Sequence, residues 1–356
     1  MKNEALENLL KRLVEIEPTE SPMISCVVNL EYPRETALRE IEARGELAAK
    51  RLTGVRRQDF EDAFEGIQGY LRESLEPGSS SALVYSRWGD EPTFTALQFD
   101  VPLATELMVD SIPHIYPLIE LKDTYHRFVI VITTETEARI LETTIGSITE
   151  EIMQRRPELR RRIGREWTRE HYQNHRRDRE DRFIREKIRI VDDLMRRRGH
   201  NHLVVTGSPN MVGRLTAALP PRLKEKLISS FPANPKGGLD PILAESMQLF
   251  AAAENVESHD RVEALQAAVL SGGLGVAGSS ASLEALQSGC ADLLVVDQDH
   301  CEEEWREALV RSAVLNGVGV ETVKRSDVMQ GLGGSGCLLR YRPMPAVVPE
   351  FSVAVA

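Results

Sequence analysis

The feature that most limits how this chain can fold is a basic stretch at residues 155–189. It contains 14 Lys and Arg against 7 Asp and Glu, a balance of +7, whereas the 356-residue chain has a formal net charge of −11. From Thr168 to Arg182 the only large apolar residue is Tyr172. Because this part has almost no apolar surface to bury, we expect it to project from the fold as an arm.

The second half of the stretch is predicted to be a helix that packs on a core. Four apolar residues at i, i+4, i+7 and i+11 would share one helix face: Ile184, Ile188, Val191 and Met195. A helix from Glu166 to Arg198 would be roughly 50 Å long. The arm is then its N-terminal half, with Trp167 at its root.

Two interpretations of the arm's charge stay open. Pairs at i,i+4, such as Asp178–Arg182 and Asp181–Arg185, would give a solvated helix. That pairing uses only half of the positive charges, and basic side chains gain most where they displace counterions from phosphates, which favours RNA. The candidate RNA contacts in the arm are Arg165, Trp167, Arg169, His171, Tyr172, Gln173, His175, Arg176, Arg177 and Arg179.

Charge and length divide the chain into three predicted domains. Residues 1–122 have a balance of −9, residues 123–262 of +4, and residues 263–356 of −6. The nucleic-acid signal therefore belongs to the middle domain. Buried strands at Phe128–Thr133 and Leu203–Thr206, within an alternation of helices and strands, predict an α/β fold.

A second basic group is predicted at a helical hinge. Helices at about Arg34–Lys50 and Gln58–Ser74 flank residues 51–57, with Gly54 as the turn residue. Four basic residues gather at this tip: Lys50, Arg51, Arg56 and Arg57. They are candidate phosphate contacts, although an exposed turn is equally often basic for solubility alone.

Other sequence patterns argue against a cofactor, a metal or a membrane. Residues 273–278 match GxGxxG, but a predicted helix precedes them, so we expect a glycine-lined strand against a helix and no dinucleotide. His171 and His175 have metal-ligand spacing, yet Tyr172 stands where HExxH needs Glu, and arginines flank the pair. Four scattered cysteines without CxxC, and no apolar run of ~20 residues, predict a cytoplasmic protein without disulfides.

Two C-terminal segments carry a family resemblance. Residues 281–296, ASLEALQSGCADLLVV, and residues 331–341, GLGGSGCLLRY, resemble the C-terminal domain of the archaeal and eukaryotic class-1 peptide release factors and Pelota. Leu203–Asn210 is similar to a strand and turn of the middle domain of this family. The resemblance implies three α/β domains: a release-factor-like N-terminal domain, a ribonuclease-H-like middle domain and a C-terminal α/β/α domain like the kink-turn-binding ribosomal proteins.

The functional motifs of that family are replaced in this sequence. Gly164-Arg165-Glu166-Trp167 stands where the resemblance places the Gly-Gly-Gln of peptide release, and residues 51–57 stand where it places the stop-codon loop. The chain is thus similar to bacterial hibernation factors of the Balon type. This likeness implies binding to the rRNA of both subunits in the ribosomal A site, and delivery by elongation factor Tu with GTP or GDP.

Two other functions are weighed against this one. A peptidyl-tRNA hydrolase with an altered loop could use Gln173 as its water-positioning amide. A stand-alone nuclease or RNA-binding module is less favoured, because the sequence offers no carboxylate cluster suited to Mg²⁺. No catalytic residue, cofactor or metal is expected for the hibernation factor.

Overall fold

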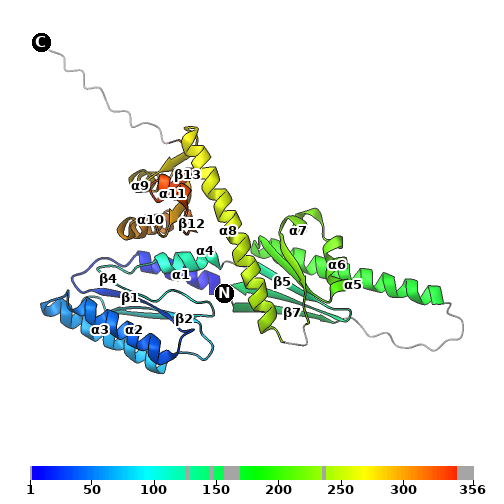
Figure 1. Cartoon of the computed structure of the whole chain (residues 1–356), viewed down its shortest axis with the longest axis horizontal. Coiled ribbons are helices and arrows are strands. Elements are labelled where there is room, and N and C mark those ends of the chain that lie inside the picture. Colours follow the sequence, from blue (N-terminus) through cyan, green and yellow to red (C-terminus); the bar gives the residue numbers. More distant parts are fainter. Residues whose placement is uncertain (1, 126–127, 145–146, 156–168, 235–237, 343–356) are drawn as a thin grey trace, which may run out of the picture. The chain divides into compact units, whose positions relative to one another are not determined.

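The computed structural model describes residues 2–125, 128–144, 147–155, 169–234 and 238–342 (Figure 1). Its strands form three separate sheets, of four, five and four strands. Helices accompany each sheet, which confirms the predicted α/β fold class. The boundaries predicted at residues 122 and 262 stay a prediction.

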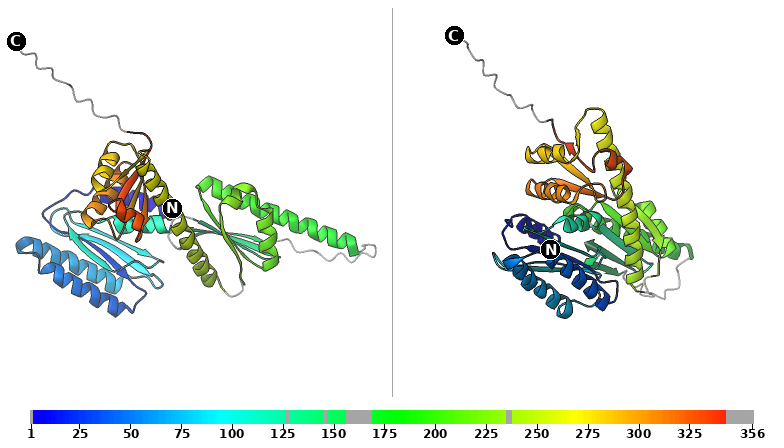
Figure 2. Two further views of the ribbon diagram at one scale, coloured as in Figure 1. Left: turned by 45° about the horizontal axis from the view of Figure 1, so that its top comes forward. Right: turned by 60° about the vertical axis from the view of Figure 1, so that its left-hand side comes forward.

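The N-terminal sheet has the order β3-β2-β1-β4 and is antiparallel throughout. Its strands are β1 (Met23–Asn29), β2 (Ser81–Arg87), β3 (Thr93–Phe99) and β4 (Glu106–Asp110). Helices α2 (Arg34–Ala49) and α3 (Gly54–Glu73) lie side by side on one face (Figures 1 and 2). Ile24, Ile41 and Ile67 are buried between the sheet and the two helices. The spacing of apolar residues on α2 and α3 therefore determines which face of each helix packs on the sheet.

The middle sheet has the mixed order β7-β6-β5-β8-β9. Its strands are β5 (Phe128–Thr133), β6 (Glu137–Thr144), β7 (Ser147–Arg155), β8 (His202–Gly207) and β9 (Leu227–Pro232). Strand β8 is parallel to β5 and β9, whereas β6 and β7 are antiparallel. Strands β5 and β8 are continuous apolar runs because they form a central parallel pair that is covered on both faces.

Helices cover both faces of the middle sheet. Three of them are α5 (Arg169–Arg198), α6 (Pro209–Ala218) and α7 (Pro221–Glu225). Residues of α5, α6 and α7 share one core with Val129 and Val205, and Phe250 packs on the other face against Phe128, with ring centroids 4.5 Å apart. Phe250 belongs to the long helix α8 (Asp240–Leu270).

The C-terminal sheet has the order β10-β13-β11-β12. Its strands are β10 (Gly275–Ala277), β11 (Ala291–Asp297), β12 (Gly319–Val323) and β13 (Ser335–Leu339), with helices α9 (Ser279–Gln287), α10 (Glu303–Leu315) and α11 (Asp327–Gly331). A Cβ on Gly275 would lie 2.8 Å from the Cβ of Ala268 on α8. The GxGxxG segment is therefore the expected glycine-lined strand against a helix.

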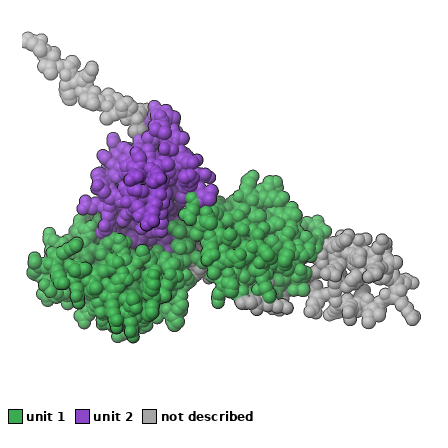
Figure 3. Space-filling view, viewed as in Figure 1, with its two compact units in different colours: residues 1–8, 17–113, 124–255 green, residues 9–16, 114–123, 256–356 purple. Residues whose placement is uncertain are grey.

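Contacts group the chain into two compact units (Figure 3). One unit comprises residues 1–8, 17–113 and 124–255, and the other comprises residues 9–16, 114–123 and 256–356. Helix α1 (Lys2–Val14) contributes to both ranges. In the second unit, Nη1 of Arg311 on α10 donates to the carbonyl oxygen of Val14 at 2.7 Å.

The prolines among residues 111–121 predict an irregular connection, but the structure forms helix α4 (Tyr116–Thr124) there. Pro117 lies in its first turn, where the missing N–H costs nothing. The carboxylate of Glu307 caps this end, accepting from the backbone N–H groups of Ile115 and Tyr116 at 2.9 and 3.2 Å. This cap lies 192 residues away along the chain, so local sequence could not reveal it.

The sequence pattern predicts two helices, Leu239–Glu254 and Asp260–Leu270, but the structure has the single helix α8 over this range. Residues 255–259 contain neither Gly nor Pro, and one helix continues through them (Figure 2). The four cysteines are free and buried. Among the described residues, no helix combines the length and apolarity needed to cross a membrane.

Candidate nucleic-acid interface

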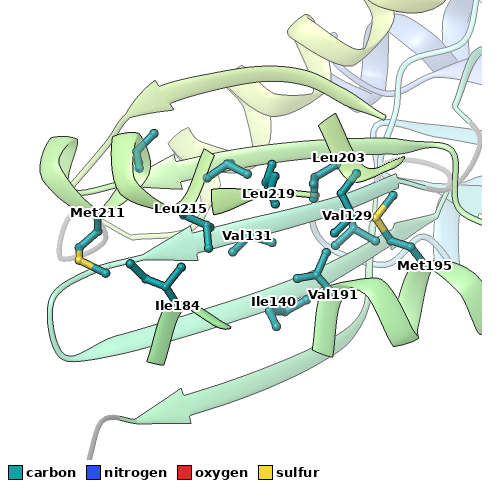
Figure 4. Packing of buried hydrophobic residues seen from close by; sticks show 13 residues of the cluster. Val129, Val131, Ile140, Ile184, Val191, Met195, Leu203, Met211, Leu215 and Leu219 are labelled. Atoms are coloured by element: carbon teal, nitrogen blue, oxygen red, sulfur yellow. The ribbon is translucent and has the colours of Figure 1, made fainter. Parts of the chain in front are cut away.

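Helix α5 is anchored to the middle domain by the predicted apolar stripe. Ile184, Val191 and Met195 are 3%, 2% and 1% exposed, and Ile188 packs against the same core. Figure 4 shows the side chains of Ile184, Val191 and Met195 on the side of α5 that faces the strands of the sheet. The C-terminal half of α5 therefore packs as the spacing predicted.

The structure places eight of the ten arm candidates in the N-terminal turns of this helix. They are Arg169, His171, Tyr172, Gln173, His175, Arg176, Arg177 and Arg179. The other two, Arg165 and Trp167, lie outside the described residues. The expected helix start at Glu166 also lies there, and the described helix begins at Arg169.

Lys187 differs from the basic residues at positions 182–198 of α5 that surround it, because it is fully buried whereas they are exposed. Its Nζ donates to Oγ1 of Thr133 at 2.5 Å and lies 3.8 Å from the ring centroid of Phe183. A buried ammonium needs such partners to offset its desolvation. Lys187 thus ties α5 to the end of β5 and adds no charge to the surface of the helix.

Ion pairs gather in the C-terminal half of α5. Nη2 of Arg196 lies 2.6 Å from Oδ1 of Asp193. Arg198 pairs with the buried carboxylate of Glu142, whose Oε1 also lies 2.8 Å from Nε2 of His200. The contacts of Glu142 fasten the end of the helix and the turn before β8 to β6, so Arg198 and His200 serve the fold.

The predicted pair Asp181–Arg185 does not form between the two side chains. Nε of Arg185 donates to the backbone oxygen of Asp181 at 3.3 Å, while Oδ1 of Asp181 accepts from Nη2 of Arg214 on α6 at 2.8 Å. The i,i+4 spacing missed this partner because Arg214 is 33 residues away along the chain. The side chain of Asp178, in the other expected pair, lies outside the described part.

The hinge presents its four candidate residues to solvent. Helix α2 ends at Ala49, α3 begins at Gly54 with φ of +62°, and Lys50, Arg51, Arg56 and Arg57 are exposed. Nε of Arg57 lies 2.8 Å from Oε1 of Glu61, both half-exposed. The first turn of α3 contains no acidic residue. Cations at a helix N-terminus oppose the helix dipole, a cost that a bound anion would remove.

Sequence inspection missed Trp88, an aromatic residue at the same end of the N-terminal domain. Trp88 follows β2 and is 55% exposed. The next residues contact α3 through Ser21: its Oγ donates to Oδ2 of Asp59 at 2.7 Å and accepts from the N–H of Asp90 at 3.0 Å. Asp59 lies three residues after Arg56, one helical turn along. An exposed aromatic near basic residues is typical of surfaces that stack single-stranded bases.

Comparison with known families matches the middle of the chain. The model described as "Bacterial archaeo-eukaryotic release factor family 10" matches residues 113–248. These residues include α5 and all five strands of the middle sheet. Comparison with curated proteins gives no match.

Solved structures similar to this chain include three archaeal proteins. The translation termination factor aRF1 is 16% identical, with a TM-score of 0.29 over 95% of this chain and 98% of that one. Archaeoglobus fulgidus Pelota is 16% identical, with a TM-score of 0.38 over 73% and 80%. Ribosome-bound archaeal Pelota is 12% identical, with a TM-score of 0.43 over 94% of each chain.

Proposed function

Residues 113–248 are homologous to the bacterial archaeo-eukaryotic release factors of family 10, and from this premise we propose that the chain is a ribosome-binding factor. It occupies the A site without termination chemistry, as a hibernation factor of the Balon type. The first domain lies at the decoding centre, and the basic arm lies near the peptidyl-transferase centre. The protein works in the cytoplasm, and elongation factor Tu with GTP or GDP delivers it.

The proposal rests on the different roles of the two ends of helix α5. The C-terminal half of α5 is fixed by Ile184, Val191 and Met195 in the core. The other end of α5 continues the basic stretch 155–189, which has a balance of +7 in an acidic chain. A firmly rooted basic arm suits a deep, phosphate-lined RNA cavity, because its charge reaches the cavity without disturbing the domain core.

The sequence at the arm's root supports binding without peptide release. Hydrolysis of the peptidyl-tRNA ester needs a water held accurately by a small group that fits against the ester. Arg165, Glu166 and Trp167 are large, and two of them are charged. Trp167 is better suited to stack on an exposed base, worth ~1–3 kcal/mol, than to orient water.

The second candidate function is peptidyl-tRNA hydrolysis with Gln173 as the water-positioning amide. Gln173 belongs to the helix α5, and a residue held by helical hydrogen bonds lacks the mobility of a Gly-Gly loop. The helical position of Gln173 therefore favours a ribosome-binding factor that does not hydrolyse peptidyl-tRNA. Replacement of the Gln173 amide tests the hydrolase alternative.

Charge reversal in the arm tests the proposal. We expect replacement of four arginines by Glu to abolish co-sedimentation with ribosomes, and wild-type binding to weaken steeply with salt. The four are Arg169, Arg176, Arg177 and Arg179. A control with the same change of charge reverses four exposed arginines elsewhere: Arg39, Arg44, Arg72 and Arg325. Unchanged co-sedimentation of the arm variant, or equal loss in the control, would contradict the proposal.

A further inference from the structure

We propose that the groove between α5 and α6 binds a phosphate of the RNA backbone, with Arg185 and Arg214 as its ligands. This inference rests on the proposed function. It extends the RNA contact from the arm to the body of the middle domain, where the sequence pattern pointed to no site.

The groove has the size and lining of a backbone-binding site. Its volume is about 500 Å³, and it is lined by Asp181, Ile184, Arg185, Arg214, Ala217 and Ala218. The side chain of Ile184 is buried, while Ala217 and Ala218 are exposed. Small alanines let a sugar-phosphate chain approach the helix surface closely. Two guanidinium groups on the same groove supply charge complementary to phosphate.

Asp181 holds both arginines through different atoms. Its carboxylate accepts from Nη2 of Arg214 at 2.8 Å, and its backbone oxygen accepts from Nε of Arg185 at 3.3 Å. A guanidinium has five N–H donors, and Arg185 uses only Nε in its contact with Asp181, so its other N–H groups can ligate a phosphate. Asp181 therefore pre-orders the two ligands, and its own negative charge opposes the anion that they bind.

The groove is continuous with the arm through exposed arginines of α5. Arg182, Arg185 and Arg189 follow the spacing i, i+3, i+7, which places them on one side of the helix, and all three are exposed. In the part of the chain that the structure describes, neither Arg182 nor Arg189 forms an ion pair. An RNA strand that follows the arm toward the domain would meet Arg182 and then the groove at Arg185.

Two types of variant in the full-length protein test the groove, because they should change the affinity for ribosomes in opposite directions. Arg185→Gln and Arg214→Gln should each lower the slope of log affinity against log salt by about 1, and each should weaken ribosome binding about tenfold at ~0.1 M salt. Asp181→Asn should strengthen binding, because it removes a negative charge beside the phosphate. Loss of folding cannot produce that gain, so a structural role for Asp181 would not imitate it.

The matched control uses another exposed ion pair of the same chain. Nη2 of Arg44 lies 2.9 Å from Oε1 of Glu40 on α2, and Arg44→Gln and Glu40→Gln should leave the slope unchanged. Unchanged slopes in Arg185→Gln and Arg214→Gln, beside the loss of co-sedimentation in the arm variant, would overturn the groove proposal alone. Weaker binding by Asp181→Asn would also overturn it. Wild-type protein that does not bind ribosomes would overturn the proposed function and the groove together.

Discussion

A buried carboxyl group in the second compact unit gives a quantitative prediction. Asp123 lies at the end of α4, and its Oδ2 accepts from the N–H and the Oγ1 of Thr322 at 2.6 and 2.8 Å. Burial, followed by the nearby carboxylate of Glu321, raises the pKa of Asp123 to about 7, against the lowering effects of Thr322 and Arg261. The contact between α4 and β12 is therefore formed with a carboxyl that resists ionisation.

The sign of the pH dependence follows from this direction. In the unfolded chain Asp123 has its ordinary pKa of 3.8, so between about pH 4 and pH 7 the folded state holds a proton that the unfolded state has lost. Stability from this group is present below about pH 4 and falls as the pH rises to about 7. A shift from 3.8 to about 7 corresponds to about 4 kcal/mol at most, at 1.36 kcal/mol per pKa unit.

Replacement of Asp123 by Asn should remove this loss of stability. The amide oxygen can accept both hydrogen bonds from Thr322, and it carries no charge to desolvate. Asp123→Asn should therefore be about 2 kcal/mol more stable than the wild type at pH 5 and about 4 kcal/mol more stable at pH 8. Urea unfolding followed by the fluorescence of Trp305, with Trp88 and Trp167 replaced by Phe, reports on this unit.

The matched control is Asp292→Asn, which removes the same charge from an exposed pair with Arg340. Exposed pairs contribute ~0–1 kcal/mol, so this variant should follow the wild-type protein at both pH values. The reasoning about Asp123 would be refuted by an Asp123→Asn protein that is less stable at pH 8, or that keeps the wild-type difference between pH 5 and pH 8.

Further predictions concern the interface and its support. Arg56→Ala with Arg57→Ala should weaken binding to isolated small subunits more than to large ones, and equal loss in filter binding would count against the decoding-centre placement. Trp88→Ala should cost ~1–3 kcal/mol of small-subunit affinity without a change in the melting temperature, and unchanged affinity would exclude stacking. Met195→Ala should lower the free energy of unfolding in urea by ~2–5 kcal/mol, and a smaller loss would mean that α5 is held elsewhere. Ribosomes with labelled peptidyl-tRNA should release peptide at the spontaneous rate in the presence of the protein, whereas rapid release lost in Gln173→Ala would establish the hydrolase.

The sequence predicted features whose signal is local and repeated. The apolar spacing of α5 places Ile184, Val191 and Met195 on one helix face, and this local pattern was sufficient to predict that the face packs on the core. The apolar runs of β5 and β8 likewise marked the centre of the middle sheet. Each signal lies within one element and needs no distant partner.

Features that depend on distant partners could not be predicted from the sequence. Helix α4 is capped by Glu307, which no local rule connects to Tyr116. The carboxylate of Asp181 binds Arg214 on another helix, although i,i+4 spacing suggested Arg185. Trp88 joins the hinge surface only because Ser21 and Asp59 hold the turn after β2 against α3. Tertiary contacts therefore decide which charged and aromatic residues share a surface.

A cryo-EM reconstruction of bacterial ribosomes incubated with the purified protein tests the central claim most directly. We expect density for the chain in the A site, with the hinge residues Arg56 and Arg57 against small-subunit rRNA. The N-terminal end of α5 should point into the large subunit, and the groove at Arg185 should contact an rRNA phosphate. Density at another ribosomal site, or empty A sites at saturating protein, would contradict the account.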